Sequence, residues 1–266
     1  MLNFKGIEMK FCITTNKNIK AIEEALKLKD RLIKNGHVFD DENPEIVFSI
    51  GGDGNFLKTV QRFIDIDPVY ATVNFGKLGY LCQYKANELS ELEEDIENGA
   101  LNIREISLLE TTVNNKTLYA VNEFKIQANS SKTFKFDVLI NDTLLENFKG
   151  DGCLITTSIG SSGSGKSLGG ALVDNEIEMI QFVEIGALRN KVFSSIGSPY
   201  VLNYDKKITL KNLKPANFSM FYDCKSIQFE NFEGSLTFKL SNKKIRFLKN
   251  SRNNYIEKTR EAFVSD

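Results

Sequence analysis

A carboxylate set among glycines is the feature of this sequence best suited to chemistry. The motif Gly-Gly-Asp-Gly at residues 51–54 follows an apolar run at 46–50 and precedes helical spacing at 56–64. Glycines let a backbone turn tightly against a ligand, and a helix N-terminus offers free N–H groups to an anion. An acid facing phosphates, here Asp53, can take a proton from an attacking hydroxyl or hold a divalent cation. A purely structural alternative is that Asp53 only caps the helix.

The bulk composition indicates a globular protein whose overall charge gives no sign of a nucleic-acid or membrane partner, although a small polyanion could still be bound locally. The chain has 266 residues, 41% of them hydrophobic, which is enough for one large or two ordinary domains. Its 34 Lys and Arg residues nearly balance 35 Asp and Glu residues, for a net charge of −1. We therefore expect no nucleic acid and no membrane as partners.

The cysteines and the single histidine exclude several classes of site. The four cysteines are far apart and form no CxxC pair, which disfavours a zinc ribbon or a dithiol redox centre. One histidine cannot build a His-based metal site, and most hydrolase triads are disfavoured as well. The N-terminus lacks a signal-peptide pattern and no run of eighteen apolar residues occurs, so a cytoplasmic location is expected.

The first hundred residues alternate short apolar runs with helical periodicity, which predicts an α/β domain with a parallel sheet. Strands are expected at residues 10–14, 46–50 and 69–73. Helices are expected from 19 to a stop at 35–36, over 56–64, and from a cap at Asn87 to a stop at Gly99. This domain is assigned to residues 1–100.

From about residue 101 the sequence becomes rich in strand segments separated by turn residues, such as Asn114-Asn115 and Asn141-Asp142. This texture predicts an all-β second domain, a β-sandwich over residues 101–239. Helical spacing returns in the C-terminal stretch 250–263. We expect that helix to return to the first domain, so that residues of about 240–266 complete it.

Residues 160–167 match the P-loop pattern letter for letter, but their context argues against a P-loop. A P-loop requires a long helix that opens at its lysine, and here Gly169 and Gly170 follow almost at once. Each glycine costs roughly 1 kcal/mol inside a helix. The motif also lies in the β-rich half, whereas a P-loop is expected early in an α/β sheet.

A wider set of motifs carries a resemblance. Gly-Gly-Asp-Gly at 51–54 is followed by Gly-Lys-Leu-Gly-Tyr at 76–80, Asn-Glu at 122–123, Lys-Gly-Asp-Gly at 149–152 and a serine and glycine loop closing with Ser-Leu-Gly-Gly-Ala at 167–171. In this order and spacing the motifs, from about residue 44 to 200, resemble the NAD kinase family. The resemblance implies an α/β domain, a β-sandwich domain, an active site between them, and assembly into homodimers or homotetramers.

The resemblance also implies an activity and the residues that perform it. The reaction would transfer the terminal phosphoryl group of ATP, or of polyphosphate, to the 2′-hydroxyl of the adenosine ribose of NAD, with a divalent cation such as Mg²⁺. Asp53 would be the catalytic proton acceptor, beside Gly54 and Lys58. No residue is assigned as a metal ligand. The remaining residues that would bind substrate are Asn122, Glu123, Lys149, Asp151, Ser162, Gly163, Ser164, Gly165, Lys166, Ser167 and Gly186, the last reaching a neighbouring subunit's ligand.

One departure from the family pattern keeps an alternative open. Many members carry Thr-Pro-Thr-Gly-Ser-Thr-Ala-Tyr where residues 157–164 read Thr-Ser-Ile-Gly-Ser-Ser-Gly-Ser. The change to Ser164 removes an aromatic face worth on the order of 1 kcal/mol in stacking. An NAD(P)-binding sensor without turnover is therefore one alternative. A lipid or sugar kinase that shares the Gly-Gly-Asp-Gly turn is another, and the motifs at 122–123 and 149–152 speak against it.

Overall fold

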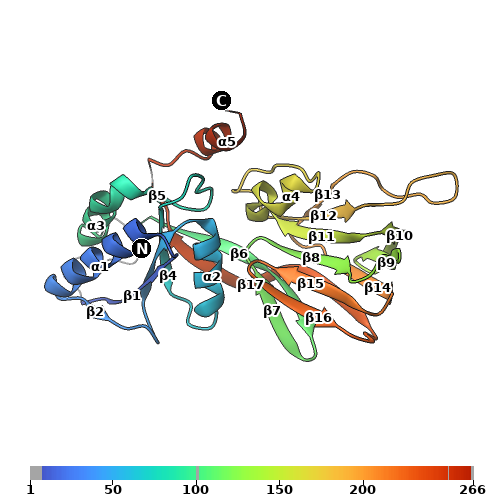
Figure 1. Cartoon of the computed structure of the whole chain (residues 1–266), viewed down its shortest axis with the longest axis horizontal. Coiled ribbons are helices and arrows are strands. Elements are labelled where there is room, and N and C mark those ends of the chain that lie inside the picture. Colours follow the sequence, from blue (N-terminus) through green and yellow to red (C-terminus); the bar gives the residue numbers. More distant parts are fainter. Residues whose placement is uncertain (1–7, 100–101, 251, 265–266) are drawn as a thin grey trace. The chain divides into compact units, whose positions relative to one another are not determined.

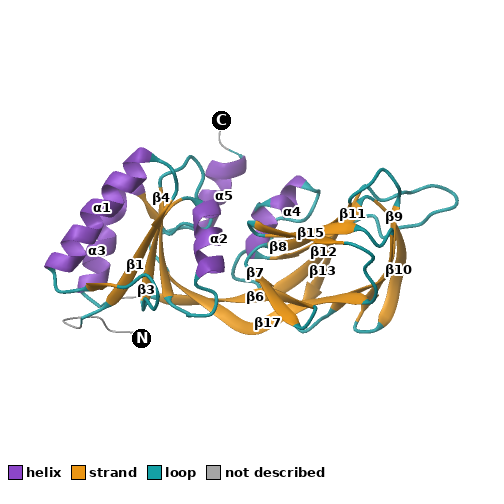
Figure 2. Ribbon diagram, turned by 60° about the horizontal axis from the view of Figure 1, so that its bottom comes forward, coloured by secondary structure: helices purple, strands orange, loops and turns teal. Residues whose placement is uncertain are grey.

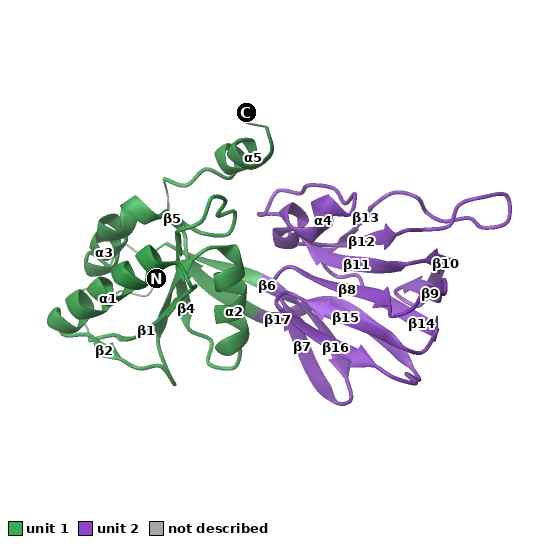
Figure 3. Cartoon of the chain, in the orientation of Figure 1, with its two compact units in different colours: residues 1–106, 244–266 green, residues 107–243 purple. Residues whose placement is uncertain are grey.

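The computed structural model describes residues 8–99, 102–250 and 252–264, and the chain divides into two compact units (Figures 1 and 3). Unit 1 comprises residues 1–106 and 244–266, and unit 2 comprises residues 107–243. Both boundaries fall inside strands, β6 (Ile103–Val113) and β17 (Ser235–Leu248). Within the described residues, no helix is long and apolar enough to cross a membrane.

Unit 1 is built on a parallel sheet with the order β17-β4-β3-β1-β2, and β5 also pairs with β4. Besides β17, its strands are β1 (Lys10–Thr15), β2 (Val38–Phe39), β3 (Ile46–Gly51), β4 (Val69–Asn74) and β5 (Tyr84–Lys85). In the β3–β4 pair, Gly51 lies opposite Asn74. The turn that follows β3 and the segment that follows β4 therefore leave the same edge of the sheet.

Helices cover both faces of this sheet (Figure 2). They are α1 (Ile19–Lys34), α2 (Asp53–Arg62) and α3 (Leu89–Glu97), with a C-terminal α5 (Tyr255–Phe263). Strand β3 alternates: Ile46, Phe48 and Ile50 pack in a core with the buried residues of α1 and α3. On the other face, Ser49 accepts a bond from Thr59 of α2. This alternation follows from the two-residue period of a strand and makes three layers.

Two helix starts differ from the sequence-based prediction. Helix α2 begins at Asp53 rather than at 56, because Gly52 supplies the extended N-cap and residues 53–55 already form the first turn. Helix α3 is not capped by Asn87, which lies in the short 3₁₀ turn η1 (Ala86–Glu88). The N-cap of α3 is Glu88, whose side chain makes no capping bond to α3 and instead accepts a bond from the backbone N–H of Lys85.

Unit 2 is a sandwich of antiparallel strands. One layer has the order β10-β9-β14-β17, with β6 pairing with β17 and β7, and the other has the order β13-β12-β11-β8-β15-β16. The first layer holds, besides β6 and β17, β7 (Lys116–Ala120), β9 (Phe134–Ile140), β10 (Thr143–Gly150) and β14 (Ile208–Lys214). The second holds β8 (Glu123–Ala128), β11 (Gly152–Thr157), β12 (Met179–Ile185), β13 (Tyr200–Asn203), β15 (Phe218–Tyr222) and β16 (Lys225–Phe229).

Aromatic side chains join the two layers. The rings of Phe124 and Phe238 lie 5.3 Å apart, and those of Phe134 and Phe218 lie 5.5 Å apart, each pair drawing one ring from each layer. All four are fully buried in one core. The predicted fold class, an α/β domain with a parallel sheet plus a β-sandwich and a C-terminal helix packed on the first, is confirmed.

Candidate active site

Asp53 lies at the edge of unit 1 where β3 ends and α2 begins. The turn depends on Gly51, because a Cβ there would lie 2.8 Å from the Cβ of Asn55. Gly52 is the N-cap, and no side chain of the described residues makes a capping bond to α2. The alternative that Asp53 serves only as a helix cap is therefore wrong, since its carboxylate is directed elsewhere.

The carboxylate of Asp53 is held by the segment that follows β4. The backbone N–H of Tyr80 donates to Oδ2 at 2.8 Å, and that of Leu81 donates to Oδ1 at 2.9 Å. The thiol of Cys82 donates to Oδ1 at 3.5 Å. Because each carboxylate oxygen can accept two bonds, Asp53 keeps acceptor capacity for a further donor.

The electrostatics of Asp53 suit a proton acceptor. Burial raises the pKa of Asp53 above its ordinary value, while the bonds from Leu81, Tyr80 and Cys82 and the charge of Lys258 pull it back. A carboxylate with a raised pKa has a stronger affinity for a proton than a solvated one. On the same helix, Gly54 and Lys58 are exposed, and open space surrounds the Cα of Gly54.

In unit 2, the turn that carries Asn122 and Glu123 is fixed from two sides. The carboxylate of Asp223 accepts bonds from the backbone N–H groups of Val121 and Asn122, both at 2.9 Å. From the opposite side, the hydroxyl of Thr157 donates to the carbonyl of Val121 at 2.8 Å. This turn between β7 and β8 is therefore rigid, and the two side chains that follow it are presented in fixed positions.

Two acceptor atoms of this pair lack a donor. Oε1 of Glu123 accepts from the hydroxyl of Ser164 at 2.9 Å. Oε2 of Glu123 and Oδ1 of Asn122 are buried and find no hydrogen-bond partner among the described residues. Burial also raises the pKa of Glu123 to about 7, and the Ser164 bond opposes that rise. Unpaired buried acceptors are costly, so they point to a ligand that brings hydroxyl or amino donors.

The serine and glycine loop packs directly on this turn. It consists of η2 (Ile159–Ser162) and the short helix α4 (Ser164–Ser167). A Cβ at Gly160 would lie 2.4 Å from the carbonyl oxygen of Asn122, so only glycine fits there. Helix α4 ends after four residues, and Gly169 follows with φ of +85°. A P-loop needs a helix that begins at its lysine and whose first amides bind the phosphates, and a four-residue helix does not provide one, as the sequence context predicted.

The members of this loop differ in exposure. Gly165 is buried, while Ser162 and Ser164 are half-buried. Gly163, Lys166 and Ser167 are exposed. Among the predicted site residues of unit 2, the structure brings Asn122, Glu123 and the loop at 162–167 together, through the bond from Ser164 to Glu123 and the approach of Gly163 to Asn122.

Lys149, Asp151 and Gly186 form a separate group in unit 2. A Cβ at Gly186, where φ is +59°, would lie 2.2 Å from Oδ2 of Asp151, so these two residues are in close contact. The ammonium of Lys149 lies 3.9 Å from the centre of the Phe193 ring. Asp151 is exposed and remains accessible to a ligand.

The sequence-based prediction missed the residues that hold the site in place. Tyr80, Leu81 and Cys82 act on Asp53 mainly through backbone groups, which leave no side-chain signature in a sequence. Asp223 lies in the turn between β15 and β16 with φ of +46°, a conformation that Asp tolerates better than most residues. Only the fold brings it to the backbone of Val121 and Asn122.

Residues 121–250 match the family model of the ATP-NAD kinase C-terminal domain. The chain is 32% identical over 256 residues to NAD kinase 2 of Bacillus subtilis strain 168, covering 94% of each protein. It is 31% identical over 265 residues to the NAD kinase of Lysinibacillus sphaericus strain C3-41, covering 97% of this chain and 100% of the relative.

Two solved structures share the fold. An NAD kinase from Archaeoglobus fulgidus in complex with ATP superimposes with a TM-score of 0.80 at 21% identity, covering 95% of this chain and 99% of that one. Yeast NADH kinase complexed with NADH gives a TM-score of 0.84 at 18% identity, covering 97% and 89%. At these identities the likeness shows the fold.

Proposed function

This chain belongs to the NAD kinase family, and we propose that it transfers the terminal phosphoryl group of ATP to the 2′-hydroxyl of the adenosine ribose of NAD, making NADP. The observation that carries the proposal is the Asp53 carboxylate, fixed at the Gly-Gly-Asp-Gly turn by the amides of Tyr80 and Leu81. Relatives named NAD kinase match almost the whole chain, which favours this reading over a lipid or sugar kinase.

In this proposal Asp53 accepts the proton of the ribose hydroxyl as its oxygen attacks the terminal phosphorus. Phosphoryl transfer passes through a loose transition state, so the enzyme mainly aligns donor and acceptor and balances charge. A base with a raised pKa suits this task, because it attracts the proton more strongly than a solvated carboxylate does. The bonds from two backbone amides keep the carboxylate from rotating.

The residues of unit 2 are proposed to bind the dinucleotide. The free acceptors of Asn122 and Glu123 suit the hydroxyl or amino donors of a nucleoside. Lys149, Asp151 and the loop from Ser162 to Ser167 would bind the rest of the substrates. Gly54 and Lys58 of α2 would meet phosphates, because a helix N-terminus and an exposed ammonium both attract anions.

A divalent cation, Mg²⁺ by our proposal, would accompany ATP rather than occupy a protein cage. The described residues contain no group of three or more His, Cys, Asp or Glu side chains arranged to hold a metal ion. We propose that the ion is bound mainly by triphosphate oxygens and water, which is the usual mode for Mg²⁺. When bound, the cation neutralises negative charge on the transferring phosphates.

Assembly and location complete the proposal. We expect a homodimer or homotetramer, in which Gly186 approaches the ligand of a neighbouring subunit, and a cytoplasmic location. Light scattering coupled to size exclusion tests the assembly, since a monomer has a mass of 30.0 kDa. Whether polyphosphate replaces ATP is tested by supplying each donor in turn.

The decisive experiment incubates the protein with NAD, ATP and Mg²⁺ and measures NADP with an NADP-specific enzyme. Asp53→Asn is expected to lower kcat by about 10²- to 10⁴-fold, the usual contribution of a general base, while calorimetry still detects NAD binding. Asp30→Asn removes an equal charge from an exposed position on α1 and is expected to leave kcat unchanged.

The alternatives have their own signatures in the same assay. A wild-type protein that binds NAD but makes no NADP would support the sensor without turnover. Asp53→Asn with a kcat near that of the wild type would remove Asp53 from the proposed mechanism.

A further inference from the structure

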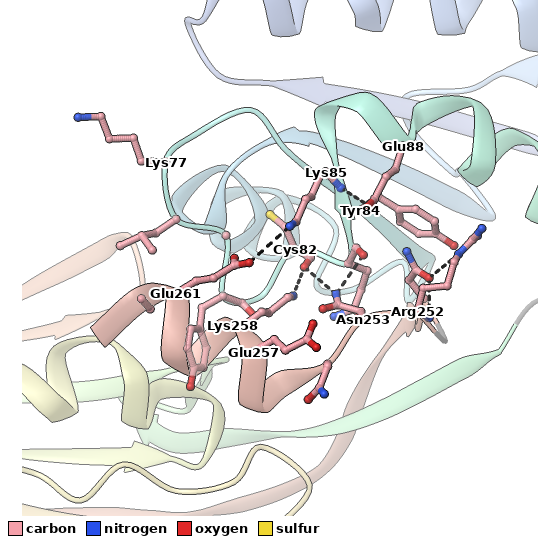
Figure 4. A pocket seen from close by; sticks show the side chains of 17 residues that line it. Lys77, Cys82, Tyr84, Lys85, Glu88, Arg252, Asn253, Glu257, Lys258 and Glu261 are labelled. Carbon is pink, nitrogen blue, oxygen red and sulfur yellow. Dashed lines mark hydrogen bonds and ion pairs between the residues drawn. The ribbon is translucent and has the colours of Figure 1, made fainter. Parts of the chain in front are cut away.

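The C-terminal helix α5 holds the same backbone segment that holds Asp53. The ammonium of Lys258 donates to the carbonyl oxygen of Tyr80 at 3.3 Å and, more closely, to that of Cys82. Asn253 also donates to Cys82, at 3.4 Å (Figure 4). These contacts lie on the wall of a cavity of about 180 Å³ between the segment after β4 and the C-terminal residues.

One peptide group links Lys258 to Asp53. The carbonyl of Tyr80 and the N–H of Leu81 belong to the same planar unit and point in opposite directions. The carbonyl accepts from Lys258, and the N–H donates to Oδ1 of Asp53. A cation on the oxygen side polarises the peptide and strengthens the bond that its N–H donates, as in any hydrogen-bonded chain.

Ring contacts add to the hold of α5 on this segment. The Tyr80 ring packs edge-on against Tyr255 with centroids 5.0 Å apart, and it also meets Phe263 at 5.8 Å. The hydroxyls of Tyr80 and Thr259 lie 2.6 Å apart. Tyr80 itself is 9% exposed.

We propose that Lys258 is a positioning residue for phosphoryl transfer: its charge, passed through the Tyr80–Leu81 peptide, aligns the Asp53 carboxylate and keeps it ionised. The inference rests on the proposed function, because it assigns Lys258 a part in the step that Asp53 performs. Lys258 acts without contact with the reacting atoms.

The charges around Lys258 agree with this role. Burial lowers the pKa of Lys258, while Cys82 and Asp53 oppose that change. The remaining charged groups that affect Lys258 are Lys85 and Glu261, which pair with each other at 3.7 Å on the exposed side. Lys258 is therefore the cation that lowers the pKa of Asp53, against the burial that raises it.

The test compares two glutamine variants by steady-state kinetics across pH. Lys258→Gln keeps an N–H donor for the carbonyls but removes the charge. We expect its acid limb of kcat/KM to move up by about half to one pH unit, and kcat at pH 7.5 to fall about 3- to 30-fold. The KM values for NAD and ATP should stay within about twofold. The matched control, Lys85→Gln, removes an exposed ammonium from the same cavity wall and should leave all of these unchanged.

A second measurement uses the wild-type protein alone and does not depend on turnover. In an NMR titration without substrates, the Leu81 amide and the Lys258 side chain should both show an inflection at the pKa of the Asp53 carboxyl. Lack of that shared inflection overturns the proposal, as does a Lys258→Gln enzyme with the wild-type acid limb and kcat. A wild type that makes no NADP but shows the shared inflection contradicts only the proposed function.

Discussion

At the scale of single residues, the buried carboxyl of Glu123 makes the stability of the folded protein depend on pH. Its side chain is largely buried with one oxygen bonded to Ser164 and the other without a donor. Burial raises the pKa of Glu123 to about 7 from a reference value of 4.5. The folded protein therefore holds a proton on Glu123 at pH values where the unfolded chain has released it.

This linkage fixes the sign of a pH effect on stability. Between pH 4.5 and 7 the folded state binds more protons at Glu123, so the unfolding free energy falls as pH rises through this window. Glu123→Gln removes the effect. From pH 5 to pH 8 we expect the wild type to lose about 2 kcal/mol relative to Glu123→Gln, seen by calorimetry as a lower thermal midpoint.

Glu233→Gln is the control for that measurement, because Glu233 is an exposed carboxylate of the same unit. Its thermal midpoint should follow that of the wild type at every pH. If Glu123→Gln and the wild type show the same dependence, Glu123 does not carry the buried proton.

How far the sequence predicts single residues depends on whether their role is local. Asp53 could be placed from its glycines, because the turn and the helix start are encoded within a few neighbouring positions. Its partners could not, because amides at 80 and 81 reach it only through the pairing of β3 with β4. Lys258 lies about two hundred positions further along, in a stretch where only helical spacing is visible.

At the scale of elements, residues 186–199 form an irregular segment held by two acids, Glu184 with a buried side chain and Glu146 half-buried. The carboxylate of Glu184 is 6% exposed and accepts from the N–H of Gly197 at 2.8 Å. Glu146 of β10 accepts from the N–H of Ile196 at 3.1 Å. Burial, together with the nearby Glu184, raises the pKa of Glu146 to about 7, and Arg189 opposes the rise.

The same linkage, applied locally, predicts that this segment loosens with rising pH. When the segment opens, Glu146 regains an ordinary pKa, so opening becomes easier as pH passes from 6 to 8, by about tenfold. Hydrogen exchange at the Ile196 and Gly197 amides, corrected for intrinsic rates, measures this. Glu146→Gln should abolish the pH dependence, because glutamine does not titrate. Its uncharged amide can still donate a hydrogen bond to Glu184, so the segment should remain held.

An exposed acid provides the comparison here too. Glu230→Gln should exchange like the wild type at both amides. Protection of Ile196 and Gly197 that stays constant from pH 6 to 8 in the wild type would contradict the shared role of the two acids.

Elements with a strong period were predictable, and their ends were less so. Helix α1 was foreseen from apolar residues at helical spacing before a stop at Asn35-Gly36, but Ile19, Ile22, Leu26 and Ile33, on which that prediction mainly rested, are exposed. The buried face of α1 is formed by Ala21, Ala25, Leu28 and Leu32. The start of α3 was missed because Asn87 lies in a 3₁₀ turn and Glu88, whose side chain bonds to Lys85, is the N-cap. Such a choice depends on side-chain geometry that the residue types leave open.

At the scale of the whole molecule, unit 1 is assembled from both ends of the chain. The end of β17 pairs with β4, with Arg246 opposite Val69 and Phe247 opposite Tyr70. Ile245, Phe247 and Leu248 are buried. The C-terminal helix was visible in the sequence as returning periodicity, whereas the pairing of β17 with β4 is a long-range contact without a local signal.

Two truncations should separate the structural from the catalytic share of the C-terminal stretch. A chain ending at residue 243 loses three buried side chains, each worth about 2 kcal/mol or more, against a typical total of 5–15 kcal/mol. Unit 1 should therefore fail to fold, and the amides of β3 should lose protection from hydrogen exchange. A chain ending at residue 252 keeps β17 and lacks only the segment with Asn253 and α5.

That longer chain is expected to protect β3 like the full protein yet to lose at least tenfold in kcat, because Tyr80 and Cys82 are released from Lys258. Both shortened chains lack α5, so a difference between them in the protection of β3 reports the contribution of β17. A difference in kcat between the chain ending at 252 and the full protein reports the contribution of the C-terminal helix. Protected β3 amides in the chain ending at 243 would show that unit 1 does not need β17. Full kcat in the chain ending at 252 would show that Asp53 needs no support from the C-terminus.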